Sequence, residues 1–482
     1  MTASSPPSAS KKKLYQFHPL RRGPSLDTYR TLQKNRREKA DPLSVERGVR
    51  QLLADKISGN LIGLWLLVPE HLRLGTWSLL RQWAGDSQPD LDSRLALQLV
   101  HEAALGVSST RASRCLSQKG FEILNGLPFV ASDQAVHDLL DAHTIQQAQH
   151  LQIVLGCLRR ARGHFRGRLL AIDPHRMRSS SKRQMPRHCD HPGEKPRKLS
   201  QLFFCLDADT FQPVCLTLGS SAVKVSQATP ELLQMAQLIL NPASSDRPLV
   251  LSDNEHSIQS LFQWTLRHSP FDLLAPMSNT KPLQKSLREI PPDRFMPRWA
   301  GWATTHRDFS FGNSPDDVYC QLVQRAGETS QEFHFKAFLA TRFRDEVESL
   351  ALDFPKRWHI EEFFNAYQQM GWKRAGTLNL HIRYAQATMA LLAQAACHQL
   401  RARLNHPFAT WDAPHFASAI FRGMDGDLRV HNGDTILVTI YNAPQAETLR
   451  PHFENLPSLL QSEGIDPHIP WLYNYKLDFR FK

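Results

Sequence analysis

Residues 169 to 173 read LLAID, and two more short apolar runs follow, LSQLFFCLD (199–207) and QPVCLTLGS (212–220). Apolar runs of this length, enriched in aliphatic and aromatic residues, are typical of buried strands. The next segments have helical, strand, helical and strand texture in turn: TPELLQMAQLIL (229–240), PLVLSDN (248–254), HSIQSLFQWTLR (256–267) and FDLLAPM (271–277). The order of elements is therefore three strands, a helix, a strand, a helix and a strand.

This is the element order of a ribonuclease H-like core, a mixed α/β sheet flanked by helices, although other α/β folds share it. We expect this core at 165–278 and 346–404, interrupted at 279–345 by a β-rich insertion where apolar and polar residues alternate. Residues 46–164 carry apolar residues at helical spacing and predict an all-helical, DNA-binding N-terminal domain. A second helical signal, a long amphipathic run, extends from Leu380 to Leu404.

The two ends of the chain differ in character. Residues 1–45 are rich in Ser, Pro and basic residues, which predicts a flexible basic arm, or simply a solvated tail. Residues 405–482 predict a C-terminal α/β unit. It contains a hairpin signal in DLRVHNGDTILVTIY, where Asn432 and Gly433 suit the positive φ angles of a tight turn.

Charge and cysteine content restrict the class of protein. The 482 residues carry a net charge of +12, which favours a polyanionic partner, with nucleic acid first and a membrane surface second. The seven cysteines are scattered without a CxxC pair, and no apolar stretch approaches the length of a membrane span. A cytoplasmic, nucleoid-associated protein is expected.

Two acids follow apolar strands. Asp173 ends LLAID and Asp253 ends LVLSD, so both carboxylates are expected at the rim of a buried sheet. An ionised carboxylate there is unfavourable unless it is paired or bound to a metal. The alternative is that Asp173 is a turn residue at the end of its strand.

A third acid lies on a predicted helix, RWHIEEFF (357–364). Ile360, Phe363, Phe364 and Tyr367 have the i, i+3, i+4, i+7 spacing of a buried stripe. Glu361 borders this stripe, whereas Glu362 points about 100° further round. The alternative is that Glu361 is only a surface charge.

Three converging carboxylates would repel one another, and hard divalent cations such as Mg²⁺ or Mn²⁺ relieve that repulsion through oxygen ligands. Two such ions can support in-line phosphoryl transfer by activating the attacking oxygen and stabilising the leaving oxygen. Asp173, Asp253 and Glu361 are therefore the candidate catalytic and metal-binding residues, with Mg²⁺ as cofactor and Mn²⁺ as its substitute.

The block FPKRWHIEEFFNAYQ (354–368) carries a family resemblance. It resembles the Tyr-x2-Arg-x3-Glu-x6-Lys signature of the DDE transposases of the insertion sequence 4 family, although Phe354 and Gln368 depart from it. LAIDPHRM (170–177) and LSDNEHS (251–257) resemble the family's two Asp motifs. The resemblance spans about residues 95–404. It implies a ribonuclease H-like catalytic domain with a β insertion, terminal inverted repeats and target DNA as substrates, and a homodimeric synaptic complex.

Several basic and aromatic residues are candidate DNA contacts. They are Arg357 and Trp358 beside the third acid, Lys182, Arg183, Arg187 and Lys198 in a basic loop, and Arg111 and Arg114 in a helix-turn-helix-like segment. Trp299 and Trp302 could stack on a flipped base, or pack on each other within a sheet. His188, Cys189, Asp190 and His191 raise a zinc alternative, but adjacent residues rarely chelate one ion well.

Three functions stay open on the sequence. The first is a DNA transposase that cuts and joins DNA through the acidic triad. The second is a catalytically inactive DNA-binding protein derived from a transposase. The third is a stand-alone ribonuclease H-like nuclease, which would not need the helical domain or the basic arm.

Overall fold

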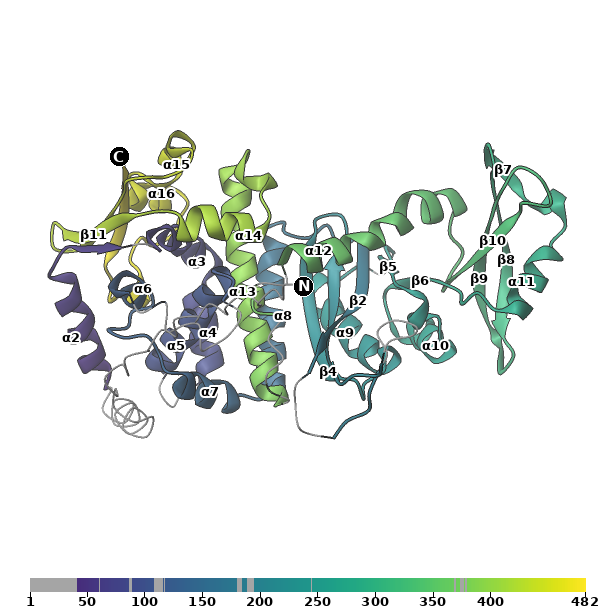
Figure 1. Cartoon of the computed structure of the whole chain (residues 1–482), viewed down its shortest axis with the longest axis horizontal. Coiled ribbons are helices and arrows are strands. Elements are labelled where there is room, and N and C mark those ends of the chain that lie inside the picture. Colours follow the sequence, from purple (N-terminus) through teal and green to yellow (C-terminus); the bar gives the residue numbers. More distant parts are fainter. Residues whose placement is uncertain are drawn as a thin grey trace, which may run out of the picture.

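The computed structural model describes residues 41–59, 61–85, 89–107, 116, 118–179, 184–188, 195–243, 245–367, 370–372, 377 and 379–482. The chain is elongated in Figure 1. Helices from the N-terminal half and a small C-terminal sheet lie at one end, strands β2 to β6 of a larger sheet lie in the middle, and strands β7 to β10 of the same sheet lie with helix α11 at the other end. Helices and mixed sheets together make this a mixed α/β chain.

The larger sheet has nine strands in the order β4-β3-β2-β5-β6-β10-β9-β8-β7. Their bounds are β2 Leu169–Arg178, β3 Leu199–Asp207, β4 Gln212–Ser220, β5 Leu249–Leu251, β6 Asp272–Pro276, β7 Met296–Trp299, β8 Trp302–Phe311, β9 Ser314–Ala326 and β10 His334–Ala340. Strands β2, β3 and β4 form an antiparallel meander, whereas β5 runs parallel to β2 and β6 parallel to β5. Strand β10 pairs antiparallel with β6, so the strands of 279–345 extend the same sheet.

Alternation along β2 divides the core between the two faces of the sheet. Leu170 and Ile172 pack in a cluster with α9 (Val225–Leu240) and α10 (Gln259–His268), whereas Leu169 and Ala171 belong to the larger core on the opposite face. Successive side chains of a strand point to opposite faces. Asp173 therefore has the parity of Leu169 and Ala171.

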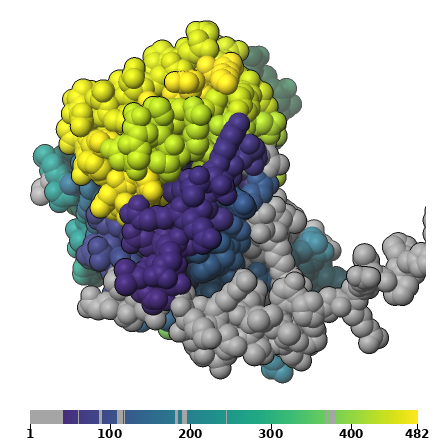
Figure 2. Space-filling view, turned by 90° about the vertical axis from the view of Figure 1, so that its left-hand side faces the viewer, coloured from purple at the N-terminus to yellow at the C-terminus, as the bar shows by residue number. Residues whose placement is uncertain are grey.

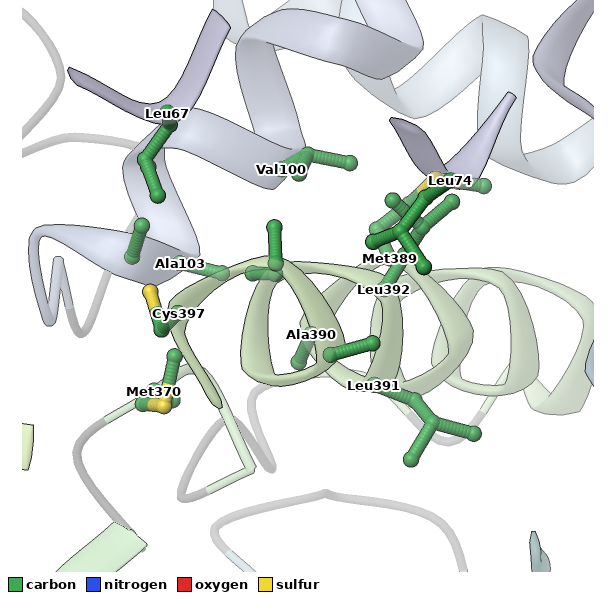
Figure 3. Close-up of a cluster of buried hydrophobic side chains, with 14 of the residues drawn as sticks. Leu67, Leu74, Val100, Ala103, Met370, Met389, Ala390, Leu391, Leu392 and Cys397 are labelled. Atoms are coloured by element: carbon green, nitrogen blue, oxygen red, sulfur yellow. The ribbon is translucent and has the colours of Figure 1, made fainter. Parts of the chain in front are cut away.

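Helix α13 (Leu380–Leu404) lies at the centre of the larger core. Its bounds match the predicted helical run, but the expectation of an amphipathic helix is wrong, because residues all round it are buried. Figure 3 shows Met389 and Leu392 beside Leu74, with Leu391 pointing away on the other side. Small alanines allow close packing, and polar side chains find partners: Gln394 donates to Gln212 and Thr388 donates to the Tyr384 carbonyl.

The N-terminal region is largely helical. The prediction that it is all-helical is wrong, because it also contains a strand. Its helices are α2 Pro42–Leu53, a 3₁₀ helix Ile62–Leu67, α3 Val68–Leu74, α4 Thr76–Ala84, α5 Pro89–Ala104, α6 Lys119–Leu124, α7 Asp133–Asp141 and α8 Ile145–Ala161. Between α2 and the 3₁₀ helix, β1 (Ile57–Gly59) pairs antiparallel with β11 (Gly426–His431). The side chains of Ile57 and Leu428 are buried at this pairing, which only the tertiary fold brings together.

Asp41 caps α2 by accepting from the backbone N–H groups of Leu43 and Ser44, and Pro42 is the first helical residue. The helix therefore begins within the predicted 1–45 arm. Residues 1–40 lie outside the described residues, and so do 108–115, which hold Arg111 and Arg114 of the helix-turn-helix-like segment.

The C-terminal sheet has the order β1-β11-β12-β13, with β12 (Thr435–Ile440) antiparallel to β11 and parallel to β13 (Lys476–Phe481). The predicted hairpin at Asn432 and Gly433 is confirmed, since both residues have positive φ between β11 and β12. Helices α15 (Ala446–Phe453) and α16 (Leu456–Ser462) accompany this sheet. Figure 2 shows the purple α2 region lying against the yellow C-terminal segment.

The remaining elements connect these parts. They are α11 Lys281–Arg288, α12 His359–Tyr367, α14 Ala413–Phe416, the 3₁₀ helices Asn254–His256, Pro292–Arg294, Phe354–Trp358, Phe408–Thr410 and Pro470–Leu472, and the π-helices Glu348–Asp353 and Ala417–Arg422. None of the helices in the described ranges has the length and apolar character needed to cross a membrane.

Candidate active site

The parallel pairing of β2 with β5 places Asp173 and Asp253 at the same level. The last paired residues are Ala171 and Leu251, and each aspartate follows two residues later. The sequence predicted that Asp173 ends its strand. That prediction is wrong, because β2 continues beside β3 as far as Arg178. Asp173 nevertheless lies just beyond the last residue of β2 that pairs with β5.

Local hydrogen bonds hold the Asp253 carboxylate. Its Oδ1 accepts from the Glu255 backbone N–H at 3.1 Å, and the His256 ring lies against the same oxygen, with Nδ1 at 2.6 Å. Burial is the largest single influence and raises the pKa of Asp253, but the hydrogen bond and charge of His256, the Glu255 N–H and the charge of Arg357 together outweigh it, and the pKa is lowered. Asp253 is therefore held in its ionised form.

Helix α12 positions Glu361 on the same face of the sheet. Ile360 and Phe363 are buried in the larger core, whereas Phe364 and Tyr367, also predicted for the stripe, are only partly buried. The Phe363 and Phe364 rings pack edge-on against Phe204 of β3, with centroids at 5.7 and 5.4 Å. The Glu361 side chain is 32% exposed, while Glu362 is exposed, as the helical rotation predicts.

Arg357 reaches Glu361 across one helical turn. Its Nη2 donates to Glu361 Oε1 at 2.8 Å, and the guanidinium is largely buried. Arg357 lies in the 3₁₀ helix that runs directly into α12, so the two side chains, four residues apart, are neighbours across the junction.

Burial and four neighbouring charged side chains determine the pKa of Asp173. Burial raises it first, the negative charges of Asp253 and Glu361 raise it further, and Arg357 and Arg176 act in the opposite direction, for a final pKa of about 8. Such coupling requires that the three acids lie near one another. The fold thus gathers the sequence-predicted acids into one electrostatic neighbourhood, with Asp173 as its protonated member near neutral pH.

The donor set suits a hard cation in chemistry, since all three candidates are carboxylates and their mutual repulsion raises the Asp173 pKa. However, within the described residues no three His, Cys, Asp or Glu side chains meet closely enough to hold a metal ion. Glu361 is instead turned to Arg357, whose charge offsets part of the negative potential that a metal would neutralise. Metal binding stays a prediction that requires these side chains to turn toward one another.

Two groups around the acids were not singled out from sequence. His256 orients Asp253, and Arg176 forms an ion pair with Glu255 while its Nε donates to Gln201 at 3.1 Å. A signal was available for each, because both occur three residues after one of the aspartates, in DPHR and DNEH.

The predicted DNA contacts are unevenly placed. Arg357 is engaged with Glu361, Trp358 is 55% exposed beside it, Arg187 is exposed, and Lys198 is partly buried. Arg111, Arg114, Lys182 and Arg183 lie outside the described residues, as do Cys189, Asp190 and His191 of the zinc alternative. A contact with DNA stays a prediction for all of these basic residues.

Trp299 and Trp302 stack on each other. They pair across β7 and β8, with ring centroids 4.0 Å apart and planes 12° from parallel. This is the packing alternative named above, yet Trp299 is still 54% exposed. Stacking on a nucleic-acid base stays a prediction for the open face of that ring.

Among known proteins, the chain has only a weak structural likeness to a solved structure. No protein-family model and no curated protein matches the chain. Among solved structures, the chain is similar to a piggyBac transposase in a synaptic complex with hairpin DNA, with 11% identity over 76% of this chain and 82% of that chain, and a TM-score of 0.39. A likeness this weak does not assign the chain to a family.

Proposed function

We propose that this chain is a DNA transposase that cuts and joins DNA strands with Asp173, Asp253 and Glu361. The observation that carries the proposal is the electrostatic coupling of Asp173, in strand β2, to Asp253, just after strand β5, and to Glu361, in helix α12 and 188 residues from Asp173 in sequence. Acids gathered at one rim of a sheet, with a strongly perturbed pKa among them, are the pattern of a functional site.

The strand arrangement supports a ribonuclease H-like core. Counted in chain order from β2, the first five strands lie as 3-2-1-4-5, with the second antiparallel to the first and the fourth and fifth parallel to it. In this proposal β7 to β10 are the insertion that precedes the helix bearing Glu361, and the N-terminal helices are the domain that binds transposon ends.

The chain's own residues prepare the site in three ways. His256 and the Glu255 N–H orient Asp253, Arg357 restrains Glu361, and Asp173 holds a proton that it must release before it can act as a ligand. Bound Mg²⁺ or Mn²⁺, as two ions, would supply charge neutralisation and activate a water or a 3′-hydroxyl for in-line phosphoryl transfer. Trp358 and Arg357 would border the scissile strand.

The expected substrates are double-stranded transposon ends and target DNA, and the working form would be a homodimer that pairs two ends. One observation favours the second candidate, a catalytically inactive DNA-binding protein: Glu361 is paired with Arg357 rather than converged with the aspartates. The experiment must therefore measure cleavage and binding separately.

The test is Glu361→Gln against Glu362→Gln, assayed on labelled DNA from both flanks of the coding region, in Mg²⁺ and in Mn²⁺. The glutamine keeps the packing of α12 but removes a metal-binding charge, so cleavage should fall by about a hundredfold or more while DNA binding is kept. Glu362→Gln is the matched control because Glu362 is exposed on the same helix. Parental cleavage by Glu361→Gln would reject the assignment, and binding without cleavage by the parental chain would favour the inactive protein.

A further inference from the structure

Helix α11 (Lys281–Arg288), at the end of the molecule farthest from α2 in Figure 1, has two opposite faces. Its inner face holds Leu287, which is fully buried, and Leu283, which packs against the same small core of β8, β9 and β10. Gln284 donates to the Phe335 carbonyl at 3.1 Å, and Ser286 accepts from Arg307 at 2.9 Å. These contacts fix the rotation of the helix on the sheet.

The outer face carries three cations. Lys281, Lys285 and Arg288 are exposed and follow i, i+4, i+7, so at about 100° per residue they form one stripe opposite the leucines. Residues 277–367 are all described, and within the described chain none of these three cations forms an ion pair. Their charge is therefore available to a partner.

Lys285 and Arg288 lie in the last turn, where a positive charge suits the helix dipole, but the place of Lys281 does not serve the helix. Lys281 is the first helical residue, where a positive charge opposes the helix dipole, and it repels Lys285 one turn later. Beside the stripe lies an open depression of about 570 Å³, lined by the three cations with Asn279, Thr280 and Gln284, and with Glu289 as its acid. Cations and polar donors around an open hollow suit phosphate oxygens.

We propose that the outer face of α11 binds the phosphate backbone of duplex DNA, at a distance from the candidate acids. The inference rests on the proposed function for the identity of the partner, and on charge complementarity for the place. Strands β2 and β5 and helix α12, which carry or precede the acids, lie between α11 and the N-terminal helices in Figure 1, so a duplex held at α11 would contact the protein on the side of the site away from those helices. The contact would carry no sequence preference, because phosphates carry no base information.

The test removes the stripe in the full chain. Lys281→Ala, Lys285→Ala and Arg288→Ala are combined, in a Glu361→Gln background and without divalent metal, so that cleavage does not enter the measurement. Binding to a short duplex of arbitrary sequence is followed by fluorescence anisotropy over a series of salt concentrations. Each lost phosphate contact lowers the slope of log affinity against log salt by about 0.9, so the slope should become shallower by about 2 to 3.

The control removes three exposed cations of the C-terminal sheet and its end, Arg429→Ala, Arg480→Ala and Lys482→Ala, with the same loss of net charge. Its slope should stay near the parental one, and equal thermal stability of both variants excludes misfolding. Equal slopes for the two variants would overturn the α11 contact while leaving the proposed function standing, whereas a parental chain that binds no DNA would overturn both.

A vesicle arm separates a membrane from DNA as the partner. Vesicles of equal parts phosphatidylserine and phosphatidylcholine should not distinguish the stripe variant from its control. Loss of vesicle binding in the stripe variant, with an unchanged DNA slope, would overturn the proposal.

Discussion

Metal binding at the acidic site should release a proton. In the metal-free chain the pKa of Asp173 is about 8, so at pH 7 about nine-tenths of the molecules carry a proton on this carboxyl group, and a carboxylate must lose its proton to bind a cation. Asp253, whose pKa is lowered, contributes no proton at this pH. We therefore expect about 0.9 proton released per chain at pH 7, falling to about 0.1 at pH 9.

The apparent affinity for Mn²⁺ should follow the same titration. Between pH 6 and pH 7 it should rise nearly tenfold, and above pH 8 it should level off, because each proton displaced adds one unit to the slope of log affinity against pH. Calorimetry of Mn²⁺ binding, repeated in two buffers with different ionisation enthalpies, measures the proton release directly.

Two variants sharpen the measurement. Asp173→Asn should abolish the proton release, and Glu361→Gln should lower the pKa of Asp173, because the Glu361 charge is one of the causes that raise it. Glu362→Gln should behave as the parental chain. An affinity that is flat between pH 6 and pH 8, with no proton release, would refute the view that Asp173 is the protonated member of a metal site.

Four further outcomes are expected. In the metal-free chain the raised pKa of Asp173 stabilises the folded state. This stabilisation is fully present below the pKa of the unfolded chain, near 3.8, and is lost as pH rises through about 8. Urea unfolding at pH 6 and pH 9 should show the loss, and Asp173→Asn should make the pH dependence flatter. Burial lowers the pKa of His71 and takes that of His101 to about 4. Their contribution to the free energy of unfolding should be fully present above the unfolded-chain pKa near 6.5 and should fall below it by about 1.4 kcal/mol per pH unit for each histidine. If the loss of stability with falling pH is as steep in His101→Gln as in the parental chain, this reasoning is wrong. Deleting residues 1–39, which hold ten Lys or Arg against two acids, should make the salt dependence of DNA binding shallower, and an unchanged slope would mean that the arm does not touch DNA. Gly63→Ala would place a Cβ 1.9 Å from the Ile420 carbonyl oxygen, whereas Gly312 has open space; differential scanning calorimetry should show a loss of about 3 kcal/mol for Gly63→Ala and little change for Gly312→Ala.

Local patterns were enough to place many elements. The apolar runs at 169–173, 199–207, 212–220 and 249–251 lie within strands, because a buried strand needs only a short stretch of side chains that tolerate burial on both faces. The run from Leu380 to Leu404 is one helix with those bounds. The Asn432-Gly433 turn followed from the rarity of residues that accept positive φ.

The same patterns misjudged what each element faces. Helix α13 has polar residues at intervals, which implied one solvated side, but Gln394 and Thr388 are satisfied internally and the helix is buried all round. The strand β1 has only three residues, too few for a periodic signal, and it exists because β11 offers an edge more than 360 residues away. Strand length and partner are tertiary properties.

The acidic site divides in the same way. The sequence by itself determined which acids are candidates, since Asp173 and Asp253 follow apolar strands and Glu361 borders a buried helical stripe, and these are patterns of a few residues. Only the tertiary structure decided the rest. The parallel register of β2 and β5 places the two aspartates at the same level, and Arg357 forms an ion pair with Glu361. Burial and the neighbouring charges raise the pKa of Asp173 to about 8. Charge interactions depend on distance and burial, and neither quantity exists until strands far apart in the chain lie side by side.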